Sequence, residues 1–175
     1  MFDNEYNIVG KHATYMKFLV NDAKVFVRYI DVYMNAAVIG YLKNRTAKRD
    51  NESKDIARIP TSAFATERLN CDFIFRLIML LDESGGLSNT ERLDRAFRND
   101  SKKKTEDDKV LHAQNMDLFH SYVYGGIEEL YEELTEGSTS RDDYINSVYD
   151  ITNAFKEEIE GINYEDKLKQ LVESN

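Results

Sequence analysis

Residues 122–134 read YVYGGIEELYEEL and place two adjacent glycines, Gly125 and Gly126, inside a strong helical pattern. An interior glycine destabilises a helix by roughly 1 kcal/mol relative to alanine, so the pair must break the helix, bend it, or allow another segment to approach closely. Apolar positions nevertheless continue across the pair in steps of three and four, at Phe119, Tyr122, Val123, Gly126, Ile127, Leu130 and Leu134. Because an interrupted helix would usually restart in a new register, this spacing predicts one continuous helix with a bare patch on its buried face. The alternative is a kink or a short loop between two helices.

A matching patch of small residues lies in NAAVIGY, residues 35–41. Ala36 and Gly40 are four residues apart and therefore share one face of a helix. Small residues on both helices allow two backbones to cross at the short end of the usual separation of roughly 8 to 10 Å. We therefore predict that this helix crosses the glycine-containing helix near Ala36, Gly40 and Gly126.

Helical spacing of apolar residues recurs along nearly the whole chain, whereas strict alternation is hard to find over more than four residues. The predicted fold class is all-α, a single-domain helical bundle of six or seven helices over residues 1–175. Polar residues without a period predict solvated loops near 43–60 and 99–108. Helices are expected over about 9–20, 23–43, 61–82, 88–99, 109–134, 140–160 and a last amphipathic segment at 164–172. Two of them open with a capping-box pattern, at Ser88–Glu91 and at Ser140–Asp143.

The composition is that of a folded protein outside the membrane and inside the cell. The N-terminus is acidic and polar where an export signal would be basic and then apolar. The longest apolar run, FIFRLIMLL at 73–81, is about half as long as a bilayer span requires and contains Arg76. The single cysteine, Cys71, lies just before this run, in LNCDFIFRLIMLL at 69–81, and is interpreted as a core residue. We expect a cytoplasmic protein that does not associate with membranes.

Motifs of catalysis, metal binding and cofactor binding are absent from the sequence. Among the histidines, only His120 has a carboxylate three residues away, Asp117, and a two-metal site in a helical bundle would need a second such pair and further glutamates. The paired carboxylates over 128–133 have the spacing of a solvated helix face. We therefore expect no enzyme activity, no cofactor and no metal site.

Charge is distributed unevenly along the chain. Residues 1–104 contain 18 Lys and Arg against 14 Asp and Glu, a net +4, while residues 105–175 contain 5 against 18, a net −13; the sum is −9. In ERLDRAFRNDSKKK, starting at Glu91, arginines recur every third residue, and we expect them to project from one side of a helix that Leu93 and Phe97 anchor on the other. The candidate anion-binding or partner-binding residues are Arg92, Arg95, Arg98, Lys102, Lys103 and Lys104.

These observations favour a non-catalytic helical protein that binds another protein, as an accessory subunit or as a homo-oligomer. In this hypothesis the basic residues contact acidic helices of the same chain or of a second copy. An alternative is a nucleic-acid-binding component of a bacterial defence or mobile-element system, since a basic segment supplies sequence-independent affinity for phosphates. A lesser alternative is an acidic inhibitor that mimics DNA. The sequence identifies neither the partner nor the biological process.

Overall fold

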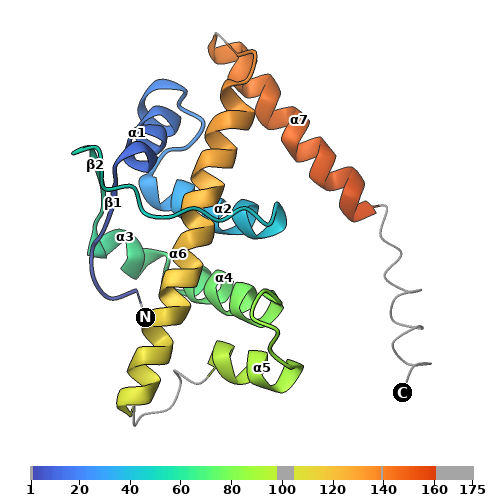
Figure 1. Cartoon of the computed structure of the whole chain (residues 1–175). Helices are drawn as coiled ribbons and strands as arrows, with labels where there is room; N and C mark the ends of the chain where they lie inside the picture. Colours follow the sequence, from blue (N-terminus) through green and yellow to red (C-terminus); the bar gives the residue numbers. More distant parts are fainter. Residues whose placement is uncertain (1, 98–104, 139, 161–175) are drawn as a thin grey trace. The chain divides into compact units, whose positions relative to one another are not determined.

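The computed structural model describes residues 2–97, 105–138 and 140–160. Contacts between residues divide the chain into two compact units, residues 1–133 and residues 134–175, and each is described by itself. Helices dominate the described residues, which confirms a mostly helical fold (Figure 1). The expectation of a single domain over the whole chain stays a prediction.

Seven α-helices form most of the described structure. Their bounds are α1 Lys11–Lys17, α2 Tyr29–Leu42, α3 Thr61–Thr66, α4 Arg68–Leu81, α5 Asn89–Phe97, α6 Glu106–Thr135 and α7 Arg141–Glu160. A π-helical turn, Phe18–Asp22, extends α1.

Two short strands accompany the helices, and the sequence analysis did not predict them. β1, Tyr6–Val9, pairs antiparallel with β2, Ile56–Ile59, and Tyr6 lies opposite Ile59. Each strand has four residues, too few for an alternating pattern to stand out in the sequence. The predicted solvated loop near 43–60 is therefore wrong over β2, where Ala57 and Ile59 are buried.

Local backbone chemistry explains where the first two helices begin. The predicted helix over 9–20 starts at Lys11 because Gly10 adopts a positive φ of 68°. The predicted helix over 23–43 starts only at Tyr29, because the Asp31 carboxylate accepts a hydrogen bond from the backbone N–H of Arg28 at 3.0 Å. Both predicted capping boxes are present, with Glu91 accepting from the Ser88 N–H and Asp143 accepting from the Ser140 N–H.

Helix α6 runs through the glycine pair without interruption, which confirms the predicted continuous helix. A Cβ added to Gly40 would lie 2.1 Å from the Tyr122 carbonyl oxygen, and one added to Gly126 would lie 1.8 Å from the carbonyl oxygen of Ala36. The three residues named from the sequence thus meet where α2 crosses α6. A different segment fills the space beside Gly125, because a Cβ added there would lie 2.1 Å from the carbonyl oxygen of Arg45.

The core of the first unit is aromatic. Rings from the N-terminal segment, α2, α3, α4 and α6 pack edge to face or stack at centroid separations of 5.5 to 6.4 Å. They belong to Phe2, Tyr33, Phe64, Phe75 and Phe119, all of which are buried. Offset and edge-to-face pairs of this kind add to the stabilisation from burial alone.

Candidate functional site

The basic segment predicted as a binding face is only partly described. Arg92 and Arg95 lie in α5, whereas Arg98, Lys102, Lys103 and Lys104 lie outside the described residues. Arg95 does not project into solvent, since it is only 7% exposed. Its guanidinium donates to the carbonyl oxygens of Met79 and Asp82, at 2.6 to 2.9 Å. The predicted role of Arg95 as a surface contact is therefore wrong.

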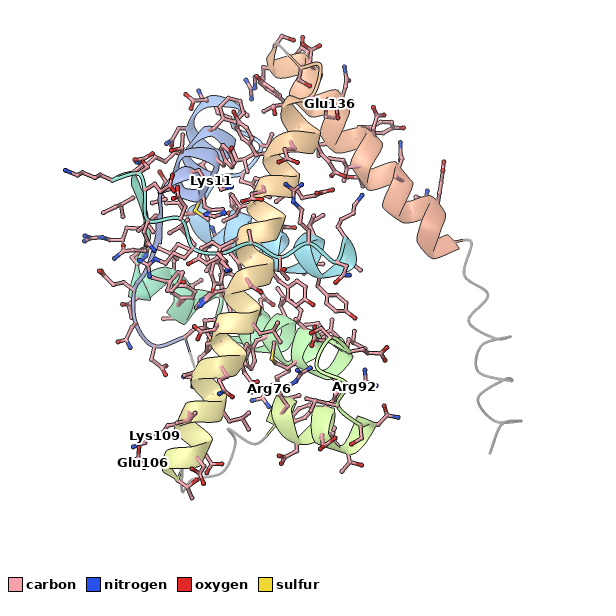
Figure 2. The ribbon with its side chains drawn as sticks, in the orientation of Figure 1. Lys11, Arg76, Arg92, Glu106, Lys109 and Glu136 are labelled. Atoms are coloured by element: carbon pink, nitrogen blue, oxygen red, sulfur yellow. The ribbon has the colours of Figure 1, made fainter. Side chains whose placement is uncertain are left out.

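The last carbonyls of a helix have no partner within that helix, and a buried guanidinium offers several donors to them. This is why Arg95 faces inward, beneath the C-terminal end of α4. The predicted orientation of α5 is consequently reversed, because Leu93 and Phe97 are exposed. Arg92, which Figure 2 labels on α5, donates to Glu83 at 2.7 Å and to Asn89.

Asp82 forms a buried polar cluster with Arg95 at the end of α4. Its carboxylate accepts from Arg95 at 3.3 Å, from the Tyr122 hydroxyl at 2.6 Å and from Ser84. Burial, followed by the hydrogen bond to Asp82, raises the pKa of Tyr122. A pocket of about 650 Å³ lies beside this cluster. Its charged lining residues are already paired, Glu83 with Arg92 and Asp82 with Arg95, so they hold the end of α4 in place.

A second charged cluster contradicts the predicted solvated face over 128–133. Arg45, in the connection between α2 and β2, donates to Glu129 at 2.6 Å and to both carboxylate oxygens of Glu132. These hydrogen bonds lower the pKa of Glu132. Glu128 accepts from His12 and Lys11 on α1. The cluster therefore fastens α1 and the connection after α2 to α6.

The surroundings of His120 and Cys71 indicate a structural role for both side chains. His120 is hydrogen-bonded to the Tyr33 hydroxyl at 3.0 Å and stacks on Tyr6, and burial lowers its pKa to about 4. Burial raises the pKa of the Cys71 thiol to about 12, which makes it a poor nucleophile at neutral pH. Within residues 2–97, 105–138 and 140–160, no three His, Cys, Asp or Glu side chains are placed to hold a metal ion.

An apolar surface that the sequence did not predict lies on α4. Its members recur every four residues and are 39 to 83% exposed, and we call this row the α4 ridge: Leu69, Phe73, Leu77 and Leu81. The opposite side of the same helix is buried, through Cys71, Phe75, Ile78 and Met79. Since residues 73–81 are apolar except for Arg76, the sequence pattern indicates a core helix but not which side of that helix remains uncovered.

A hollow beside the ridge separates α4 from α2. Its volume is about 250 Å³, and it is lined by Met34, Asn35 and Val38 from α2 and by Asn70, Phe73 and Ile74 from α4. The two helices run in the same direction here. Arg28 bonds Glu67 at 2.8 Å where both begin, and the Tyr41 hydroxyl donates to the Leu81 carbonyl at 3.2 Å where both end. The ridge and hollow thus form one continuous surface along paired helices.

No helix among the described residues combines the length and the apolar character that crossing a membrane requires. Comparison of the chain with protein-family models, with curated proteins and with solved structures finds no match in any of the three.

Proposed function

We propose that this is a non-catalytic helical protein that binds another protein chain, and that its contact surface is the α4 ridge with the adjoining hollow. The observation that carries the proposal is the row of four large apolar side chains exposed along a helix whose other side is already in the core. A contiguous apolar surface of this kind marks protein interaction sites, because leaving it in water costs free energy that a partner recovers.

Charge pairing supports this proposal over nucleic-acid binding. Several basic side chains are already bonded to carboxylates of the same unit: Arg45 to Glu132, Arg92 to Glu83 and Arg95 to Asp82. Counterion release from phosphates needs cations that are free to face the nucleic acid. The described part of the predicted basic face therefore offers little for that purpose.

A photo-reactive phenylalanine analogue at position 73 tests the proposed surface in cells that express the full chain. We expect a covalent adduct with a protein upon illumination, and we expect Leu77→Asp, introduced in the same chain, to remove it. The matched control carries the analogue at Val110, an exposed apolar position on α6, and should give no such adduct. Equal labelling from positions 73 and 110 would contradict the proposal.

A further inference from the structure

We propose that residues 43–55, the connection between α2 and β2, act as a lid on α6 that opens and closes as one unit while the rest of residues 1–133 stays folded. We call this connection the α6 strap. The proposal concerns α6 and is independent of the α4 ridge. Three features support it: the composition of the strap, the bonds that hold it, and the bare helix surface beneath it.

The α6 strap contains no side chain that anchors it in the core. Ala47 is its only apolar residue, and none of its residues is buried. Connections of this length without a helix or a strand are uncommon in compact domains, and many of them are lids or binding loops. Holding such a segment in one conformation costs backbone entropy, and here no buried apolar side chain offsets that cost. The closed position therefore depends on polar contacts.

Ion pairs with α6 supply many of these polar contacts. Arg45 donates to three carboxylates of α6 at 2.6 to 3.3 Å, those of Glu128, Glu129 and Glu132. Lys43 lies 3.0 Å from the Glu133 carboxylate, and the backbone N–H of Ala47 donates to the Ser121 carbonyl oxygen at 2.9 Å. Salt screens ion pairs between partly exposed side chains, whereas it does not weaken apolar packing. The strap is therefore held by the kind of contact that ionic conditions change.

The helix surface beneath the strap is bare backbone. A Cβ added to Gly125 would lie 2.1 Å from the Arg45 carbonyl oxygen and 2.8 Å from the Thr46 nitrogen. Gly126 faces α2 instead, so α6 passes between α2 and the strap (Figure 1). Buried side chains such as Tyr33 fix α2 in the aromatic core, and the strap has no such anchor. The strap can therefore leave α6 while α2 remains in place.

Backbone bonds at its two ends define the points about which the strap opens. At the first end, the N–H of Arg45 donates to the carbonyl oxygen of Gly40 at 2.8 Å. At the second end, the N–H of Gly10 donates to the carbonyl oxygen of Asp55 at 3.0 Å, directly before β2. Opening therefore moves residues 46–54 and preserves both α2 and the strand pair.

Opening changes one short stretch of α6. It frees the Ser121 carbonyl oxygen from its bond to Ala47, and it uncovers the backbone at Gly125, where no side chain projects. The strap therefore controls access to this stretch of the helix.

Hydrogen exchange of the Ala47 amide, measured in the full native chain at low and high salt, tests the lid. Raising the salt from about 0.01 M to about 1 M shortens the Debye length from about 30 Å to about 3 Å, so we expect exchange at Ala47 to accelerate about tenfold. Exchange of the Ile127 amide, on the buried part of α6, should not accelerate. Equal salt dependence at the two amides would show that the strap opens only when the whole unit unfolds, and would overturn the proposal.

Removing the central cation tests whether charge holds the strap. We expect Arg45→Met to make the Ala47 amide exchange rapidly at both salt concentrations, so that the salt dependence disappears. The matched control is Arg92→Met, which removes an ion pair with Glu83 elsewhere in the same unit and should leave exchange at Ala47 unchanged. Native exchange rates at Ala47 in the Arg45→Met chain would contradict the proposal.

The two neighbouring glycines separate the lid from the core. Gly125→Ala places a methyl group against the Arg45 carbonyl oxygen, so it should displace the strap and accelerate exchange at Ala47 while the urea midpoint stays near the native value. Gly126→Ala places the same methyl group against the Ala36 carbonyl oxygen and should lower the urea midpoint. If Gly125→Ala lowered the midpoint as much as Gly126→Ala, the strap would be part of the core and the proposal would be wrong.

Discussion

Backbone contact at single glycines determines how closely α2 and α6 approach. Replacing Gly126 with Ala adds a methyl group only 1.8 Å from the Ala36 carbonyl oxygen, so one of the two helices must move. We expect Gly126→Ala to lower the free energy of unfolding by about 3 kcal/mol, although alanine is the better helix former. Urea denaturation measures this loss.

The matched control is Gly85→Ala, because its new Cβ would lie 3.7 Å from Leu87, an ordinary contact, and Gly85 does not require a positive φ. We expect this variant to stay within about 0.5 kcal/mol of the native protein. If both glycine variants were equally stable, the close crossing would not exist in solution.

His120 makes stability depend on pH. Burial, followed by the charge of Arg49, lowers its pKa from 6.5 to about 4, so the imidazole is neutral in the folded chain while the unfolded chain binds a proton. Stability from this residue is therefore complete above pH 6.5 and is lost as the pH falls toward 4.

As the pH falls from 6.5 to about 4, we expect the free energy of unfolding to decrease by about 2 to 3 kcal/mol more in the native protein than in His120→Gln. Glutamine does not titrate, and its side chain offers an oxygen that accepts from Tyr33. Denaturant titrations of both proteins at the two ends of the interval provide the comparison. An identical pH dependence would show that His120 is not the titrating group.

The sequence predicted single residues well where helical period decides their position and poorly where a tertiary partner does. Ala36, Gly40 and Gly126 could be named because steps of three and four place them on buried faces. Arg95 could not, since its position follows from unpaired carbonyls at the end of α4, a different element thirteen residues earlier. Spacing along the sequence does not distinguish a buried arginine from an exposed one.

At the scale of elements, the buried pair of Arg95 and Asp82 holds α5 against the end of α4. Removing only the cation leaves Asp82 buried with too few donors, so we expect Arg95→Met to cost about 3 to 5 kcal/mol. The double variant Arg95→Met, Asp82→Asn should recover part of this loss. Thermal unfolding of both variants measures the difference, and a fully stable single variant would mean that Arg95 reaches solvent.

The sequence was sufficient to predict that the helices exist. It did not predict which side of each helix the neighbouring elements cover. Capping boxes predicted where α5 and α7 begin because those signals are local. The strands β1 and β2 lie about fifty residues apart and have only four residues each, so neither carries a period of its own. The α4 ridge escaped prediction for a related reason, since exposure of one side of an apolar helix depends on which neighbours the fold supplies.

At the scale of the whole chain, the division into two units predicts how a shortened protein behaves. The aromatic core contacts described above lie within residues 2–133, and α6 ends at Thr135. We expect a chain ending after Thr135 to unfold in one cooperative transition, with a midpoint within a few degrees of that of the full chain. Calorimetry checks this, and a broad, non-cooperative transition would show that residues 136–175 complete the core.

The long sequence separation between α1 or β1 and their partners on α6 has a consequence for synthesis. Tyr6 cannot bond to the Tyr124 hydroxyl, and His12 cannot bond to Glu128, until most of the chain has left the ribosome. At roughly 5 to 20 residues per second, the aromatic side chains of the first hundred residues spend several seconds without α6 to cover them. The nascent chain is therefore most prone to aggregation in the interval just before α6 emerges. A chaperone that binds exposed apolar segments has its largest effect in that interval.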